Sequence, residues 1–195
     1  MTDEFKTISD KIGEGYYSEK RSKFLAFAHH INSEQMAKEI IAEYRKKYFD
    51  ARHCCYAYAV GPEREEYRQN DDGEPSSTAG KPIMGQILSN DLTDILIVVV
   101  RYYGGVNLGT SGLIEAYRTA AADAIRNCEI VISQVEEIVK FDFTYPMMNG
   151  VMRIVKEMNP RIVSRDYNTT CSITLSIRKS KVEELKSRLN GLAFQ

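Results

Sequence analysis

The chain has 195 residues, of which 43% are hydrophobic and 27% are charged, and its formal net charge is −1. This is the composition of an ordinary globular protein that can bury one good core or two small ones. No apolar run is long enough to cross a bilayer, and the polar start MTDEFKTISD is unlike a signal or transit peptide, so we expect a cytoplasmic protein. Residues 1–135 carry a formal charge of −4 and residues 136–195 one of +3, too little to predict strong, indiscriminate nucleic-acid binding.

The four cysteines, Cys54, Cys55, Cys128 and Cys171, occur without a C-x-x-C pair. Cys54 and Cys55 are adjacent, and adjacent residues of a strand point to opposite faces, so they cannot easily bind one ion together. We therefore expect buried thiols rather than a zinc site, and we expect neither a metal nor another cofactor.

The first part of the chain predicts a β-hairpin followed by a helix. Gly15–Ile31 reads as two strands around the charged turn SEKRSK, and the apolar run Phe24–Ala28 indicates that the second strand is buried on both faces. Ser33 is a helix cap, and Glu34–Tyr48 has the apolar stripe of a helix that lies on a sheet. Arg52–Gly61 and Arg64–Asn70 then predict a second pair of strands.

The loop NDDGEPSSTAGKP (Asn70–Pro82) contains more special residues than an ordinary connection needs. Turn chemistry at Asp72-Gly73 and Glu74-Pro75 explains its first half. Its second half leads into apolar residues at helical spacing, and Pro82 suits the first turn of that helix. The free backbone N–H groups of this helix end, with the hydroxyls of Ser76, Ser77 and Thr78 close by, predict a site for an anion.

A second glycine-rich loop, RYYGGVNLGTSGL (Arg101–Leu113), follows the apolar run DILIVVV, which predicts a strand at the centre of a sheet. The loop leads into a helix from Leu113 to about Asn127. Its N–H groups could cradle an anion, although it is neither a Walker loop nor a G-x-G-x-x-G loop, and its glycines could equally serve a tight crossover. Arg101 with Tyr102 and Tyr103 suits phosphate, nucleotide or single-stranded RNA, whereas the alternative is a tyrosine in the core and Arg101 paired with Asp71, Asp72 or Glu74.

From about Val135 the pattern changes to strand, helix, two strands and helix, the order of a ferredoxin-like split unit without its last strand. We expect the two strands to join at Asn168-Thr169 and LAFQ (residues 192–195) to form a stub of the last strand, which would be short or incomplete. The change of pattern and of charge predicts an α+β protein with two domains, residues 1–132 and 133–195.

Catalysis has little support in the sequence. Asp71, Asp72 and Glu74 could hold a hard cation and His53 could act as a base, which would suit a hydrolase. No nucleophile elbow, H-E-x-x-H helix or other recognised constellation accompanies them. We therefore treat a role as an enzyme as uncertain and the less favoured interpretation.

The motifs DDGEPSSTAGKP, VVVRYYGGVNLGTSGLIEAY, KRSKFLA and ARHCCYAY resemble those of the IMPACT family, over about residues 15–127. The resemblance implies a first domain like the α/β sandwich of domain IV of elongation factor G and a second like its ferredoxin-like domain V. It also implies translation-related binding, since eukaryotic members restrain the kinase that stops initiation during amino-acid starvation. We expect this protein to be without the additional N-terminal, partner-binding domain of the eukaryotic members, which separates it from that activity. The resemblance makes Ala79, Pro82 and Leu108 signature residues of the family, in addition to the candidate binding residues.

We expect a regulator of translation that binds RNA, the ribosome or a translation-associated protein through the two loops. A sensor or enzyme for a small phosphorylated ligand or nucleotide is the alternative, and a protein-interaction module is the third. Charge reversal of Arg52 and Arg101 is expected to weaken binding without unfolding the protein. The candidate binding residues are Lys20, Arg21, Arg52, His53, Asp71, Asp72, Gly73, Glu74, Pro75, Thr78, Gly80, Arg101, Tyr102, Tyr103, Gly104, Gly105 and Gly109.

Overall fold

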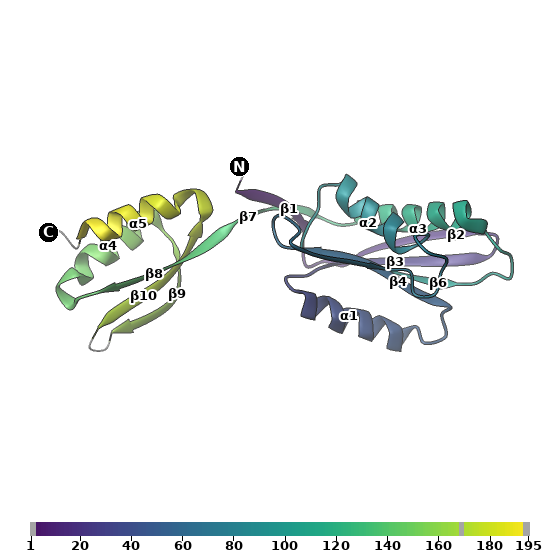
Figure 1. Cartoon of the computed structure of the whole chain (residues 1–195), viewed down its shortest axis with the longest axis horizontal. Helices are drawn as coiled ribbons and strands as arrows, with labels where there is room; N and C mark the ends of the chain where they lie inside the picture. The colour runs from purple at the N-terminus through teal and green to yellow at the C-terminus, as the bar shows by residue number, and fades with distance from the viewer. Residues whose placement is uncertain (1–2, 168–169, 193–195) are drawn as a thin grey trace. The chain divides into compact units, whose positions relative to one another are not determined.

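The computed structural model describes residues 3–167 and 170–192, and the chain forms two compact units (Figure 1). The larger unit is Phe5–Ser133, and the smaller unit combines the described residues up to Glu4 with those from Gln134 onward. Both units mix helices with antiparallel sheets, so the expected α+β class is confirmed. The division into domains at residues 132 and 133 stays a prediction.

The core of the larger unit is a five-stranded antiparallel sheet with the strand order β2-β3-β6-β4-β5. The apolar strand β6 lies at the centre, as its run of β-branched residues predicts. The strands are β2 (Gly13–Glu19), β3 (Ser22–His30), β4 (His53–Val60), β5 (Glu66–Asn70) and β6 (Ile95–Tyr102).

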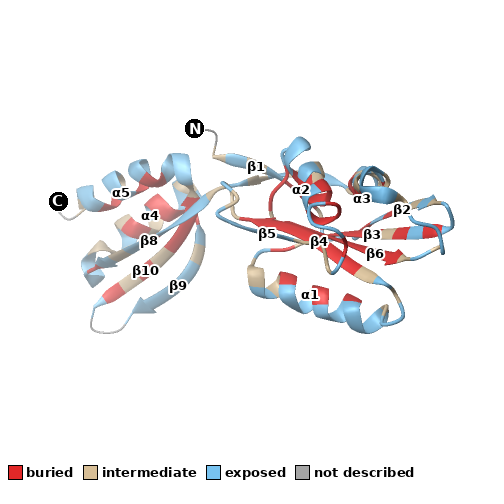
Figure 2. Cartoon of the chain, turned by 45° about the vertical axis from the view of Figure 1, so that its right-hand side comes forward, coloured by how far each residue is buried: buried red, intermediate tan, exposed pale blue. Residues whose placement is uncertain are grey.

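Helices cover both faces of this sheet (Figure 2). α1 (Glu34–Lys47) lies on one face, and α2 (Gly80–Ser89) and α3 (Gly109–Arg126) lie on the other. Strand β4 serves both cores because its side chains alternate: Cys54 packs on the side of α1 and Cys55 on the side of α2 and α3. The sheet is therefore the middle layer of three.

Local sequence explains how the helices begin and pack. The Ser33 hydroxyl accepts a hydrogen bond from the Met36 backbone N–H at 3.3 Å and so caps α1. The small residues of α3 allow close approach to β2, where a Cβ atom at Gly15 would lie 2.3 Å from the Ala124 nitrogen.

Helix α3 begins at Gly109, four residues before the start expected at Leu113. Gly109, Thr110, Ser111 and Gly112 read as loop residues because their helix propensity is low. A first turn tolerates them, since its N–H groups have no partner within the helix in any case. Part of the second glycine-rich segment is therefore the first turn of a helix.

The smaller unit has the expected order of strand, helix, two strands and helix, in a sheet with the order β8-β10-β9. Short 3-10 turns, η1 (Tyr145–Met147) and η2 (Lys179–Lys181), precede the two helices. The junction at Asn168-Thr169 lies outside the described residues, as does the expected strand stub except for Leu192, which caps α5. The elements are β8 (Glu136–Phe143), α4 (Met148–Met158), β9 (Arg161–Tyr167), β10 (Cys171–Arg178) and α5 (Val182–Gly191).

A two-stranded sheet of β1 (Glu4–Ile8) and β7 (Ile130–Gln134) was not expected from the sequence. Both strands are only five residues long, and neither has a turn signal that links it to a neighbouring strand. Within the described residues, no helix is long and apolar enough to span a membrane.

Candidate functional site

Asp71 closes the N-terminal end of α2. Its carboxylate accepts hydrogen bonds from the backbone N–H groups of Ser77 at 2.9 Å, Ala79 at 3.1 Å and Gly80 at 2.8 Å. The expectation that these donors are free for an anion is therefore wrong, because a side chain of the loop itself is that anion. Nothing in the loop's composition distinguishes such a cap from a ligand site.

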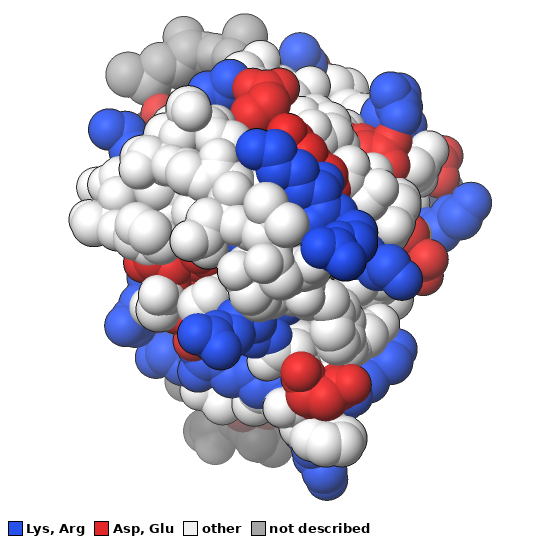
Figure 3. Space-filling view, turned by 90° about the vertical axis from the view of Figure 1, so that its right-hand side faces the viewer, with Lys and Arg blue, Asp and Glu red and all other residues white. Residues whose placement is uncertain are grey.

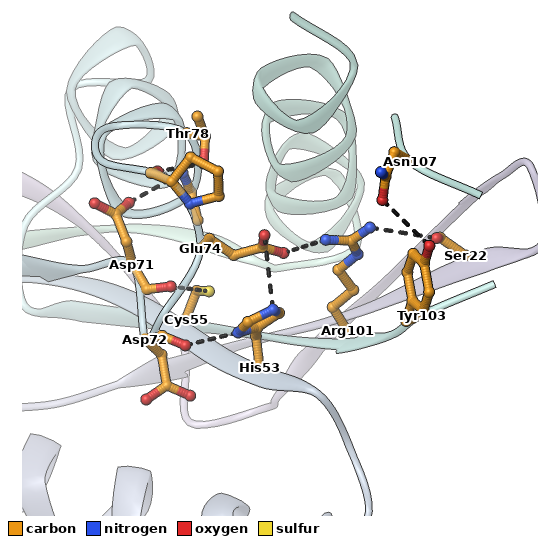
Figure 4. Close-up of polar contacts among 12 residues, drawn as sticks. Ser22, His53, Cys55, Asp71, Asp72, Glu74, Thr78, Arg101, Tyr103 and Asn107 are labelled. Carbon is orange, nitrogen blue, oxygen red and sulfur yellow. Dashed lines mark hydrogen bonds and ion pairs between the residues drawn. The ribbon is translucent and has the colours of Figure 1, made fainter. Parts of the chain in front are cut away.

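Asp72 and Thr78 also serve the shape of the loop. The Asp72 carboxylate accepts from the Cys54 backbone N–H at 2.7 Å and from the Arg45 guanidinium at 3.0 Å. The Thr78 hydroxyl donates to the Pro75 carbonyl at 2.5 Å. In Figure 4 the Asp71 and Asp72 carboxylates both point away from Glu74, so the three acids do not converge on one ion. In the described part of the chain, no group of three or more His, Cys, Asp or Glu side chains is arranged to hold a metal.

Glu74 and Arg101 form a buried ion pair that joins the two loops. Arg101 Nη1 lies 2.6 Å from Glu74 Oε1, and the two residues are only 5% and 8% exposed. The sequence left open whether Arg101 meets a ligand or pairs with an acid of the first loop, and in the structure it pairs with Glu74. A reversed charge at position 101 would face Glu74 inside the protein, so the structure contradicts the expectation that this change leaves folding intact.

Aromatic rings hold the Arg101 guanidinium in place. Its central carbon lies 5.5 Å from the centre of the Phe24 ring and 5.6 Å from that of Tyr103. Tyr102 packs against the core on the side of α1, whereas Tyr103 is 46% exposed. Tyr103 is therefore the tyrosine of this pair that can meet a ligand.

His53 faces the buried pair with one ring nitrogen. Its Nδ1 lies 2.7 Å from the Asp72 carbonyl oxygen, which only accepts, so Nδ1 carries a proton. In the neutral ring Nε2 is then the unprotonated nitrogen, 3.7 Å from Glu74 Oε2. A proton on Nε2 would add positive charge beside the carboxylate.

Tyr117 and Cys55 complete the network as neutral groups. The Tyr117 hydroxyl donates to Glu74 Oε1 at 2.8 Å, and the Cys55 thiol lies 3.3 Å from the Tyr117 oxygen. Burial raises the pKa of both groups well above their ordinary values, and it raises the pKa of Cys54 to about 11. These thiols are therefore protonated near neutral pH and are poor nucleophiles.

A cavity of about 480 Å³ opens between the two loops. Arg52, which is exposed, and the buried Arg101 bring positive charge to its wall, where Glu74 is the one acidic lining residue. The lining residues are Arg52, His53, Glu74, Pro75, Arg101, Tyr103, Asn107, Leu108, Gly109, Thr110 and Leu113.

The N-terminal end of α3 contributes to this cavity and, unlike that of α2, carries no side-chain cap among the described residues. Its N-cap residue is Leu108, whose side chain cannot accept a hydrogen bond. Gly109 and Thr110, in the first turn, line the cavity. The positive end of the α3 dipole is therefore available to a ligand in the cavity.

The turn between β2 and β3 presents two basic residues beside the second loop. Lys20 and Arg21 are exposed and have positive φ angles of 46° and 65°, a conformation that favours Asn or Gly. The Gly104 N–H donates to the Ser22 hydroxyl at 3.1 Å, and a Cβ atom at Gly104 would lie 2.1 Å from the Arg21 carbonyl carbon. The glycine thus lets the loop contact the basic turn.

The structure brings part of the candidate set to the cavity and leaves the rest in supporting positions. Arg52, His53, Glu74, Pro75, Arg101, Tyr103 and Gly109 line the cavity, and Lys20, Arg21 and Gly104 lie at the adjoining turn. The remaining candidates neither line the cavity nor lie at this turn: they are Asp71, Asp72, Gly73, Thr78, Gly80, Tyr102 and Gly105.

The candidate set chosen from the sequence missed several residues of the network and of the cavity wall, among them Cys55, Ser22, Tyr117 and Thr110. Ser22 reads as a turn residue, Tyr117 as one member of an apolar helix face, and Thr110 as part of a loop. Ser22 had a detectable signal, since it lies in the motif KRSKFLA. The sequence contains no comparable motif that marks the Tyr117 hydroxyl as part of the site.

Charged side chains are unevenly spread over the surface. On the face seen in Figure 3, Lys and Arg side chains gather in a band beside smaller groups of Asp and Glu side chains. The chain as a whole has a formal net charge of only −1, so any attraction for an anion depends on such local groups.

The family model described as the Impact N-terminal domain matches residues 20–125, which include both loops and the cavity between them. The chain belongs to the IMPACT family. This confirms the resemblance seen in the sequence motifs.

Known members align with most of this IMPACT-family chain. It is 30% identical to the IMPACT family member YigZ of Escherichia coli, over 87% of this chain and 84% of that protein. It is 32% identical to the IMPACT family member YvyE of Bacillus subtilis, over 80% of this chain and 72% of that protein. A crystal structure described as that of a hypothetical protein has a TM-score of 0.79 and 28% identity, and covers 97% of this chain and 92% of its own.

Proposed function

We propose that the protein is a cytoplasmic, non-catalytic regulator of translation that binds RNA, either free or within the ribosome, at the cavity between the two loops. One observation carries this proposal: the open N-terminal end of α3, Arg52 and the exposed ring of Tyr103 share one cavity wall. A helix dipole and an arginine suit a phosphate group, and an exposed ring suits a base.

The basic turn extends this surface beyond the cavity. Lys20 and Arg21 lie where Gly104 contacts the hairpin, so a strand whose phosphate occupies the cavity can meet further positive charge there. A two-residue turn between antiparallel strands has positive φ at both positions, so the hairpin itself fixes where these two side chains lie. Arg101 supports the site from within, since it is buried and paired with Glu74.

The family resemblance supports a connection with translation. It implies that residues 1–132 and 133–195 are domains like domains IV and V of elongation factor G. The strand order β8-β10-β9 with two helices supports a ferredoxin-like second domain.

Binding of a fluorescent single-stranded oligoribonucleotide, followed by anisotropy at several salt concentrations, tests the proposal. The double variant Lys20→Glu/Arg52→Glu should bind about tenfold or more weakly and with a smaller dependence on salt, because it loses contacts to phosphate. Both residues are exposed, so the thermal unfolding midpoint should hardly change.

Lys11→Glu is the matched control, because Lys11 is exposed and lies before β2, whereas the basic turn follows it. This variant should bind RNA like the wild type. Equal affinity of the wild type and the double variant would refute the site. Lys11→Glu changes the net charge by half as much as the double variant, so a loss of half the binding free energy lost by the double variant would show that only the overall charge matters.

A second candidate function is the sensing of a small phosphorylated ligand or nucleotide, favoured by the size of the cavity and by Arg52 and His53 in its wall. A thermal-shift series with nucleotides and inorganic phosphate separates the two candidates. Stabilisation by a mononucleotide that Arg52→Glu abolishes, without measurable RNA binding, would favour the sensor.

A further inference from the structure

A second groove, of about 690 Å³, lies on the larger unit between β5, α2 and α3. It shares no lining residue with the cavity between the loops. Its lining residues are Tyr67, Gln69, Ser77, Lys81, Pro82, Met84, Gly85, Gln86, Leu88, Ile114 and Arg118.

Large apolar side chains stand open to solvent in this groove. Tyr67 is 71% exposed and Leu88 is 52% exposed, while Met84, at 6%, is buried beside them. Tyr67 comes from β5 and Leu88 from α2, so the apolar surface continues from a strand to a helix. Exposed apolar side chains that line one groove are typical of an interaction site.

Strand β5 gives the groove an open sheet edge. It is the last strand of the five-stranded sheet, and all of its residues from Glu66 to Gln69 are exposed. Tyr67 and Gln69 pair with Ala59 and Ala57, which belong to the core beneath α2 and α3. A strand added beside β5 would therefore place alternate side chains on the same face as the groove.

The charges around the groove favour an acidic occupant. Lys81 and Arg118 are its charged lining residues, and no Asp or Glu of the described chain lines it, although acidic residues slightly outnumber basic ones in the sequence. Arg118 has only a solvent-exposed ion pair, with Glu115 at 2.9 Å, and such pairs exchange partners at little cost.

We propose that this groove binds an extended, acidic segment of a partner protein by strand addition to β5. Aliphatic side chains of the segment contact Tyr67, Met84 and Leu88, and its carboxylates lie at Lys81 and Arg118. The proposal is independent of RNA binding, since it uses another surface.

Fluorescence anisotropy with a labelled peptide of alternating Leu and Glu tests the proposal, with an alternating Leu-Lys peptide of the same length for comparison. The Leu-Glu peptide should bind and the Leu-Lys peptide should not. The double variant Lys81→Glu/Arg118→Glu and the single variant Leu88→Asp should each weaken binding by about tenfold or more. Lys11→Glu should have no effect, because Lys11 lies before β2, at the opposite edge of the sheet from β5.

Backbone methylation of the peptide tests strand addition itself. An N-methyl group blocks one donor, so methylation of one alternate set of residues should weaken binding by about tenfold or more and methylation of the other set should not. Equal binding of the two unmethylated peptides, or equal effects of the two methylation patterns, would overturn the proposal. So would sedimentation that shows the groove occupied by a second copy of the chain, or competition by an oligoribonucleotide.

Discussion

The N-terminal ends of α2 and α3 come from similar sequences but differ in whether a side chain accepts hydrogen bonds from their backbone N–H groups. Each follows a glycine-rich loop in the same unit. At α2 the Asp71 carboxylate accepts three backbone N–H groups, whereas at α3 the N-cap residue Leu108 offers no acceptor. The comparison shows that a glycine-rich loop before a helix can supply its own anion, so the loop that lacks such an acid, the one before α3, is the better candidate for a binding site.

Removal of the contact that ties the two loops together should have the largest effect. Glu74→Gln keeps the shape of the side chain but leaves the Arg101 charge buried without its partner. We expect a loss of about 3–5 kcal/mol in the free energy of unfolding, measured by urea denaturation and circular dichroism.

Glu115→Gln is the control for this change, because Glu115 pairs with Arg118 at the surface. It should cost less than about 1 kcal/mol. A similarly small cost for Glu74→Gln would mean that the buried pair does not hold the two loops together.

Asp71→Ala removes the cap at the N-terminal end of α2. The change leaves the N–H groups of Ser77, Ala79 and Gly80 without their acceptor, and we expect a loss of about 1–3 kcal/mol in the free energy of unfolding. Asp71→Asn keeps one acceptor oxygen and should cost less. An Asp71→Ala variant as stable as the wild type would show that α2 needs no cap.

The strands and helices around the site could largely be predicted from the sequence, because apolar periodicity and caps such as Ser33 act locally. The direction of the loop side chains could not. Asp71, Asp72 and Glu74 are close neighbours in the chain, yet one caps α2, one bonds to β4 and one is buried against Arg101. Such choices depend on φ at Asp72 and Gly73 and on partners as distant in sequence as Tyr117.

The start of α3 shows a second limit of prediction from sequence. Low helix propensity marks Gly109 and Thr110 as loop, but the structure includes them in the first turn. The donors of this turn, rather than those at α2, are the ones that remain open to the cavity. Which of the two helix ends is capped therefore depends on tertiary structure and could not be predicted from the loop sequences.

Thr110→Glu adds an acid at the uncapped N-terminal end of α3 and should have the smallest effect on stability. Thr110 is exposed in the first turn of α3, so a carboxylate there should interact with the helix dipole and raise the free energy of unfolding by about 0.3–1 kcal/mol. The same carboxylate would supply at α3 the anion that Asp71 supplies at α2, so the oligoribonucleotide should bind more weakly.

Thr110→Gln is the matched control for this change, because it has the size of glutamate without its charge. If α3 offers its N-terminal end to phosphate, Gln should leave RNA affinity near that of the wild type while Glu lowers it, and stability should change in the opposite direction to affinity. A Glu variant that is more stable and binds RNA as well as the wild type would place the ligand elsewhere. Because stability and affinity are measured separately, this variant distinguishes a blocked site from a damaged fold.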